Sequence, residues 1–183
     1  MAPRTRIALP LLAVLALVVL SGAVSACGYS STSKDVVEGE PVKLGELQYN
    51  VVFSRYLNPS DAEDSAYLVG QPPAPAGSTY FGVFFAVKND SGEAQPLPRS
   101  FEIVDTEHKV YRSIPSKSLY AFPLGGKVEA EEQVPALDST AQQGPIEGSL
   151  VLFQLPTSAS DNRPLTLEIP GPEPEAARVT LDL

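Results

Sequence analysis

The sequence is poor in the residues that build reactive sites. Its 183 residues include one cysteine (Cys27), one histidine (His108), one methionine and no tryptophan. A single cysteine excludes a disulfide within the chain, so the fold must be held together by its core. One histidine and one thiol are too few for the nitrogen and sulfur ligands that zinc or copper prefers. We therefore expect no metal and no cofactor.

Positive charge is also scarce. The chain has 13 Lys and Arg residues against 22 Asp and Glu residues, a formal net charge of −9. Nucleic acids and anionic lipid surfaces bind proteins through basic patches. The composition therefore predicts no nucleic-acid partner, and we expect the acidic surface to serve solubility.

The first 26 residues have the layout of a secretory signal peptide. Arg4 and Arg6 supply a positive start, residues 7–20 are almost wholly aliphatic, and residues 21–26 are mostly small. That order is typical of a signal peptide. Since the positive end stays on the cytoplasmic side, the rest of the chain is expected to cross the membrane.

The end of this leader, Val24-Ser25-Ala26-Cys27, resembles the lipobox of bacterial lipoproteins: an aliphatic residue, two small residues, then cysteine. The resemblance implies that the thiol of Cys27 receives a diacylglyceryl group and that a signal peptidase cleaves between Ala26 and Cys27. Two acyl chains hold a protein stably on a bilayer. We expect a protein anchored by lipid on the extracytoplasmic face of the cell membrane.

Two other interpretations of the leader stay open. Residues 7–24 are near the lower limit of about 17–25 residues for a membrane-spanning helix, so the leader could be an uncleaved anchor. Cys27 could instead be a buried structural cysteine, although no strand pattern surrounds it. Both membrane interpretations place the residues after Cys27 outside the cytoplasm.

Cleavage before Cys27 would leave 157 residues, which suits one domain of ordinary size. Residues 27–40 are polar and rich in small side chains, and we expect them to form a flexible, lipidated tether. Residues 41–183 are then the folded domain. Its 18 prolines and 13 glycines, counted over the whole chain, favour turns and extended segments over long helices.

The domain shows the two-residue alternation of half-buried strands. The strongest pattern covers residues 79–89, where Phe81, Val83, Phe85 and Val87 share the face expected to point into the core. A second strand is expected at residues 47–54, with Leu47, Tyr49, Val51 and Phe53 pointing inward. Further strands are expected at 101–105, 110–111, 148–155, 165–169 and 179–183, and residues 127–133 suit a short strand or one helical turn. Seven or eight strands without an amphipathic helix predict an all-β fold, an immunoglobulin-like antiparallel β-sandwich.

Three stretches resemble an immunoglobulin-like extracytoplasmic domain of many Gram-positive lipoproteins, the DUF4352 or telokin-like group. Residues 80–89 (YFGVFFAVKN) are similar to its long apolar strand, 104–111 (VDTEHKVY) to its Asp-rich hairpin before a tyrosine, and 147–156 (EGSLVLFQLP) to its late strand ending at proline. His108 departs from the glycine more usual in that hairpin. The resemblance covers roughly residues 42–170 and implies a fold and a location; the family has no established catalytic residues.

Catalytic motifs are missing from the sequence. A serine triad would need His108, which we expect on an exposed hairpin turn, and no serine lies in a Gly-x-Ser-x-Gly motif. Lipidation of Cys27 would also remove the thiol as a nucleophile. Asp61, Glu63 and Asp64 could supply oxygen ligands for calcium, but we expect solvated charges on a loop. The same interpretation applies to Glu129, Glu131 and Glu132.

The sequence thus predicts a non-catalytic, lipid-anchored domain that binds an envelope protein, a cell-wall component or a small ligand. The proline-rich residues 71–78 could contribute to a recognition surface, although such a loop is usually a connector. An alternative is an envelope hydrolase with two carboxylates converging in a cleft. A second alternative is the accessory substrate-binding lipoprotein of a transporter, which the small size of the domain disfavours.

Overall fold

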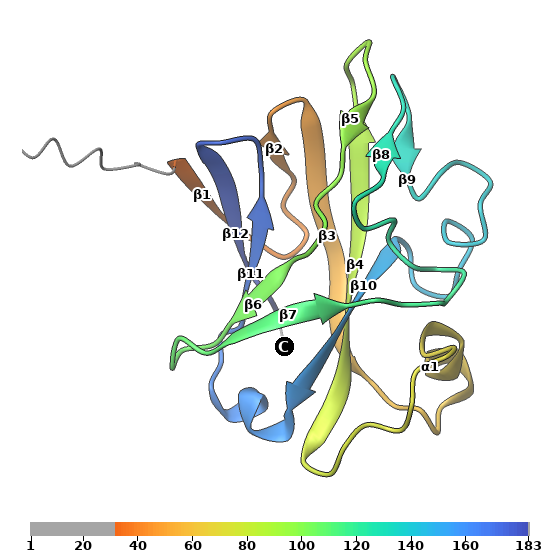
Figure 1. Ribbon diagram of the computed structural model, residues 1–183, viewed down its shortest axis with the longest axis vertical. Helices are drawn as coiled ribbons and strands as arrows, with labels where there is room; N and C mark the ends of the chain where they lie inside the picture. The colour runs from red at the N-terminus through yellow and green to blue at the C-terminus, as the bar shows by residue number, and fades with distance from the viewer. Residues whose placement is uncertain (1–31, 183) are drawn as a thin grey trace, which may run out of the picture.

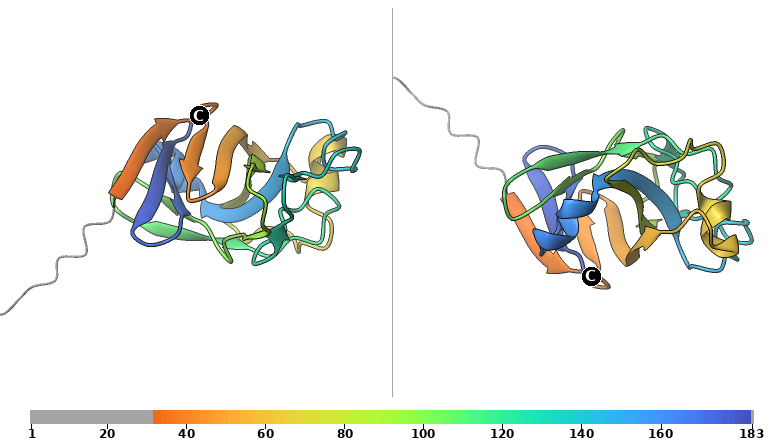
Figure 2. Two further views of the ribbon diagram at one scale, coloured as in Figure 1. Left: turned by 90° about the horizontal axis from the view of Figure 1, so that it is seen from above. Right: turned by 90° about the horizontal axis from the view of Figure 1, so that it is seen from below.

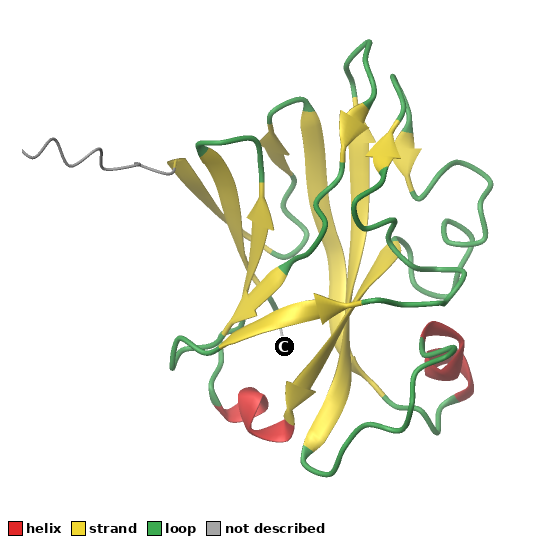
Figure 3. Cartoon of the chain, viewed as in Figure 1, coloured by secondary structure: helices red, strands yellow, loops and turns green. Residues whose placement is uncertain are grey.

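Strand β4 (Ser78–Asn89) runs through the middle of the computed structural model, which describes residues 32–182 (Figure 1). Most of this part of the chain is strand or loop, and its helices are one short α-helix and one 3-10 turn (Figure 3). The alternating pattern of residues 79–89 therefore predicted the central strand correctly. The sandwich predicted from the sequence is the observed fold class.

The described residues form twelve strands, more than the seven or eight predicted, because five of the twelve have only two or three residues. The strands besides β4 are β1 (Thr32–Val37), β2 (Val42–Leu44), β3 (Leu47–Leu57), β5 (Gln95–Pro96), β6 (Glu102–Val104), β7 (Val110–Ile114), β8 (Lys127–Val128), β9 (Gln133–Val134), β10 (Ser149–Pro156), β11 (Thr166–Pro170) and β12 (Glu175–Thr180). The helical segments are α1 (Ala62–Tyr67) and the 3-10 turn η1 (Thr157–Asp161).

Strand β7 joins the two layers of the sandwich. Its first residues pair with β6, and Ser113 and Ile114 pair with β10. One layer therefore contains β1, β12, β11 and β6, and the other contains β10, β4, β3 and β2. A strand that passes from one sheet to the other is a common way of making a sandwich corner. The pairings are antiparallel except for β1, which lies parallel to β12, and one parallel bridge between Ala121 and Leu150.

The main core lies between the layers. Phe81, Val83, Phe85 and Val87 of β4 all point into it and are at most 1% exposed, as predicted from the sequence. Phe85 also belongs to an aromatic cluster with Phe101 and Phe122, whose ring centroids lie 4.9–5.6 Å apart. Burial of each large side chain contributes about 1.5–3 kcal/mol, so this cluster is a major part of the core.

The opposite face of β4 is buried as well, which the alternation did not predict. Tyr80 and Phe84 belong to a second cluster that α1 and the neighbouring loops cover. Tyr67 of α1 packs edge-on against Phe84, with 5.1 Å between ring centroids. Figure 2 shows the molecule from above and from below, and in both views α1 lies at the end opposite to β1 and β12.

Three local predictions need correction. Residues 32–37, assigned to the tether, form β1, so the folded domain begins no later than Thr32 rather than at residue 41. The sequence hid this edge strand because only Val36 packs against the core. A bulge between Val51 and Phe53 turns Phe53 outward, and its side chain is 42% exposed. Residues 127–133 form neither one strand nor a helical turn: the first two are β8, residues 129–132 are the connection, and Gln133 begins β9.

Within residues 32–182, no helix combines the length and apolar character that crossing a bilayer requires. The predicted signal peptide and the lipidation site lie outside the described residues.

Candidate functional site

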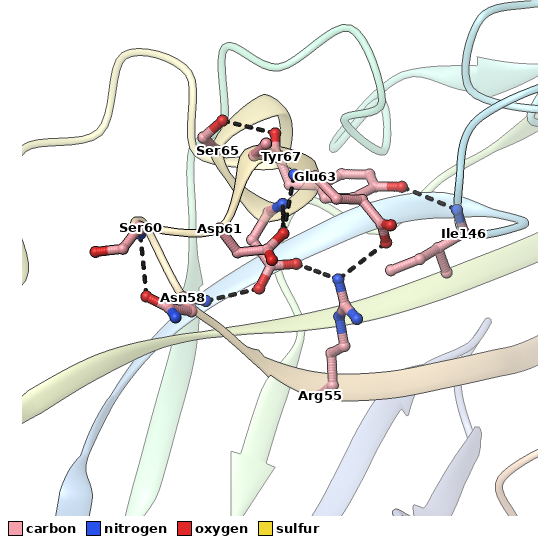
Figure 4. Close-up of polar contacts among 10 residues, drawn as sticks. Arg55, Asn58, Ser60, Asp61, Glu63, Ser65, Tyr67 and Ile146 are labelled. Carbon is pink, nitrogen blue, oxygen red and sulfur yellow. Dashed lines mark hydrogen bonds and ion pairs between the residues drawn. The ribbon is translucent and has the colours of Figure 1, made fainter.

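The acidic side chains of residues 61–64 hold helix α1 in place rather than forming an ion-binding loop (Figure 4). Asp61 caps α1 by accepting hydrogen bonds from the backbone N–H groups of Glu63 and Asp64. The carboxylate of Asp64 is 7% exposed, pairs with Arg55 of β3 and accepts a hydrogen bond of 2.7 Å from the N–H of Asn58. The prediction of a solvated charge on a loop is therefore wrong for Asp64. Its carboxylate is buried because Arg55, on the outer face of β3, supplies a positive charge beneath the helix.

The hairpin between β6 and β7 is also structural. The Oδ1 atom of Asp105 accepts hydrogen bonds from the N–H groups of Glu107 and Lys109, and its Oδ2 atom accepts one of 2.8 Å from the Tyr111 hydroxyl. Burial alone would raise the pKa of Asp105, but these hydrogen bonds outweigh it and lower that pKa. His108 lies exposed at the turn with a φ of 63°, so its predicted place on a hairpin turn is confirmed.

The other residues that the sequence suggested as ligands do not come together as a metal site in the described structure. Glu129, Glu131 and Glu132 are exposed, as predicted. Among residues 32–182, no three His, Cys, Asp or Glu side chains gather closely enough to hold a metal ion. Ala26 and Cys27 lie outside the residues that the structure describes.

One pair of carboxylates does converge. Glu102 of β6 and Glu168 of β11 are direct cross-strand partners, and both line a groove of about 470 Å³ on the outer face of their sheet. Glu102 pairs with Arg112 at 2.8 Å, whereas Glu168 has no ion pair with the described residues. Like charges directly opposite each other destabilise a sheet, so this pair is a candidate for function.

A second hollow lies at one end of the sandwich, between the two layers. It has a volume of about 350 Å³ and is lined from β2, β3, β5 and the turn between β11 and β12. We call it the Tyr49 cleft. Its walls are mainly leucine and proline side chains, namely Leu44, Leu97, Pro96, Pro98, Pro170 and Pro172. Apolar walls with a few polar groups are typical of sites for small ligands.

Tyr49 is the buried polar group of this cleft. Its alternating position on β3 points it inward, and the residue is 2% exposed. Its hydroxyl makes no hydrogen bond to the described residues, and burial raises its pKa, so it stays protonated at neutral pH. The hydroxyl is not among the fully buried polar atoms that lack a partner, so it is open to the cleft and can donate a hydrogen bond to a bound group. The cleft is therefore the better candidate for a binding site.

The polar residues at the rim differ in how they are paired. Glu46 pairs with Lys43 at 3.5 Å, and the side-chain amide of Gln95 donates a hydrogen bond of 3.2 Å to Ser91 Oγ. Arg99 has no hydrogen bond or ion pair with the part of the chain that the structure describes. The two groups left for a ligand are thus the Tyr49 hydroxyl and the Arg99 guanidinium.

The cleft opens at the end of the sandwich where the described chain begins. The N–H of Thr32 donates a hydrogen bond of 3.0 Å to the carbonyl of Pro174. Pro174 belongs to the same turn as Pro170 and Pro172, which line the cleft. In Figure 1, the start of β1, this turn and β5 all lie toward the upper end of the view.

The sequence pattern places Tyr49 in the core but does not identify this site. The alternation of β3 marks Tyr49 as buried, yet nothing in the sequence shows that its hydroxyl lacks a partner. The other lining residues come from segments as distant in the chain as Pro172, which only the fold brings together. The one available signal was the prolines at 96, 98, 170 and 172, which mark strand ends and loops rather than the interiors of central strands.

No family model and no curated protein matches the chain. Among solved structures, it is similar to an uncharacterized β-sandwich protein from Clostridium difficile 630, with 14% identity, a TM-score of 0.51, and coverage of 83% of this chain and 96% of that chain. It is also similar to the yjhA protein from Bacillus subtilis, with 13% identity, a TM-score of 0.51, and coverage of 80% and 99%. At such identities the likeness shows the β-sandwich fold alone. The resemblance to the DUF4352 group stays a prediction.

Proposed function

We propose that the protein is a lipid-anchored, non-catalytic β-sandwich that binds a component of the cell envelope through the Tyr49 cleft. The observation that carries the proposal is the hydroxyl of Tyr49, which is open to a preformed cleft and has no partner among the described residues. A ligand that accepts a hydrogen bond from this hydroxyl would gain one oriented polar contact inside an otherwise apolar cleft.

The short stretch of chain between the predicted anchor and the folded domain supports the proposal. Cys27 is five residues before Thr32, and an extended chain spans at most about 3.6 Å per residue. A lipidated Cys27 would therefore hold the cleft end of the sandwich within roughly 18 Å of the bilayer surface. A ligand in or next to the membrane would be within reach of the cleft.

The anchor is tested by membrane fractionation of the native host. Wild-type protein is expected in the membrane fraction, and the Cys27→Ala variant is expected to leave it or to keep its leader. If both proteins fractionate alike with the leader removed, Cys27 is not the anchor.

Binding is tested by photo-crosslinking in intact cells. A photoreactive residue replaces Gln95 at the cleft rim or, as a control, Leu119, which is 79% exposed and lies outside the cleft. We expect a discrete adduct from position 95 that Tyr49→Phe weakens and that position 119 does not give. Equal labelling from both positions would contradict a binding site at the cleft.

An alternative function is a carboxylate-dependent envelope hydrolase, and the convergence of Glu102 and Glu168 in one groove favours it. Two carboxylates flanking a scissile bond are the usual requirement of glycoside hydrolysis. The test is turnover of purified cell-wall polymers by the wild-type protein. Activity that Glu168→Gln abolishes and Glu131→Gln leaves intact would favour this alternative over the binding function.

A further inference from the structure

We infer that the Tyr49 cleft takes a small ligand with an apolar body and one carboxylate group. The inference rests on the proposed binding function and specifies its ligand. Tyr49 and Arg99, the two side chains of the cleft without partners among the described residues, both offer N–H or O–H donors to an acceptor. The remaining polar groups of the rim are already paired within the protein.

The charge of the rim favours an anion over a cation. Glu46 is the one acidic residue that lines the cleft, and Lys43 pairs with it at 3.5 Å. Arg99 keeps its charge unpaired, because no carboxylate of the described residues pairs with it. A guanidinium binds a carboxylate through two parallel hydrogen bonds, a geometry that an alcohol or an ammonium group cannot reproduce.

Tyr49 supplies the donor inside the cleft. The hydroxyl stays protonated, and hydrogen bonds to an ionised acceptor are roughly twice as strong as those between neutral groups. A ligand carboxylate would therefore accept a hydrogen bond from Tyr49, and the positive charge of Arg99 on the same cleft would favour the anion. A ligand with only a neutral hydroxyl would leave the guanidinium without its best partner.

The walls determine the rest of the ligand. Leucine and proline side chains surround the volume of about 350 Å³, and proline rings hold the loop backbone in a fixed shape. Such a cavity suits a short aliphatic body rather than a sugar, whose hydroxyl groups would find few partners there. The same chemistry occurs in a short acyl carboxylate and in the apolar C-terminus of a peptide.

The test uses the full chain, labelled with ¹⁵N and held in lipid nanodiscs, with empty nanodiscs as the blank. Hexanoate, 1-hexanol and hexylammonium are titrated, and the amide signals of Gly45, Leu97 and Gly171 report on the cleft. N-acetylleucine is a fourth probe that represents a peptide C-terminus. Tighter binding of hexanoate would identify an acyl carboxylate, and tighter binding of N-acetylleucine a peptide carboxylate; both outcomes support the inference.

We expect the better carboxylate to bind about tenfold or more tightly than hexanol or hexylammonium, since a charge-assisted hydrogen bond is worth about one decade in affinity. Arg99→Gln should remove most of this preference and leave hexanol binding unchanged. Tyr49→Phe should weaken carboxylate binding about fivefold to tenfold. The control Arg112→Gln, which removes an arginine outside the cleft, should change nothing.

Three results would overturn the inference: equal affinities for the three hexyl probes, a carboxylate preference that survives Arg99→Gln, or no shift of the cleft amides with any probe. In each case a crosslink from position 95 in cells would leave the binding function standing with another ligand class. Absence of both the shifts and the crosslink would end the two proposals together.

Discussion

The backbone N–H of Gly45 donates a hydrogen bond of 2.9 Å to the carboxylate of Glu175. This contact joins the turn between β2 and β3 to the first residue of β12, across the open edge of the sandwich. Lys34 of β1 reinforces it, with its ammonium 3.6 Å from the same carboxylate and 2.5 Å from the carbonyl of Lys43. The hydrogen bond from Gly45 and the charge of Lys34 together lower the pKa of Glu175.

Substituting Gly45 tests how tightly this edge is closed. Gly45 has a φ of +56°, and a Cβ atom there would lie 2.7 Å from Cγ of Pro172. We expect Gly45→Ala to lower the free energy of unfolding by about 1–3 kcal/mol, because alanine is strained in this conformation and the proline ring must move. Gly92→Ala is the control, since its φ is not positive and no atom lies within 4 Å of the position that an added methyl group would take. Urea unfolding measures the stability of both variants. Equal stabilities would contradict the close contact between Gly45 and Pro172.

The lowered pKa of Asp105 predicts acid sensitivity. The unfolded value is near 3.8, and the folded value lies below it. Ionised Asp105 therefore stabilises the fold fully above about pH 5, and this contribution is lost as the pH falls through the folded pKa. In urea unfolding between pH 7 and pH 3, Asp105→Asn should show a weaker loss of stability on acidification than the wild type. Asp138→Asn, at an exposed carboxylate, should follow the wild type; a parallel response of all three proteins would refute the role of Asp105.

The ion pair beneath α1 predicts unequal effects of two neighbouring acids. Asp64 and Glu63 both contact Arg55, but the side chain of Asp64 is 7% exposed and that of Glu63 is 42% exposed. Asp64→Ala should cost about 1–3 kcal/mol, since Arg55 and the N–H of Asn58 both lose an acceptor. Glu63→Ala should cost at most about 1 kcal/mol, as usual for an exposed pair. Chemical denaturation measures both, and a larger effect of Glu63→Ala would contradict the structure.

The bulge in β3 predicts which of two apolar side chains matters more for stability, and the sequence pattern alone would predict the opposite order. Strict alternation makes Phe53 a core residue, whereas the structure leaves it 42% exposed and Val51 only 1% exposed. Val51→Ala should cost about 2 kcal/mol, and Phe53→Ala less than about 1 kcal/mol. Thermal unfolding of the two variants would show the opposite order if the strand continued without a bulge.

The alternation of long apolar segments predicted the layers of the fold because β-strands place every second side chain on the same face. Residues 79–89 and 148–155 carry this signal, and both form central strands. The signal fails where burial does not alternate. Tyr80 and Phe84 are buried by α1, a helix of six residues that is too short to show a helical period.

The candidate site was less predictable than the fold. Tyr49 was expected in the core, but whether its hydroxyl has a partner depends on residues from several separate segments. The same applies to Glu102 and Glu168, which lie far apart in the chain and become neighbours through the pairing of β6 with β11. β1 was missed for a related reason, since an edge strand paired on one side needs few apolar residues.

The most direct test of the proposed function is native mass spectrometry of the protein extracted from its own membrane. We expect an N-terminus at Cys27 that carries diacylglycerol, together with a small non-covalent ligand that the Tyr49→Phe, Arg99→Gln double variant no longer retains. An unmodified Cys27, or a ligand that the double variant retains in full, would contradict the proposal.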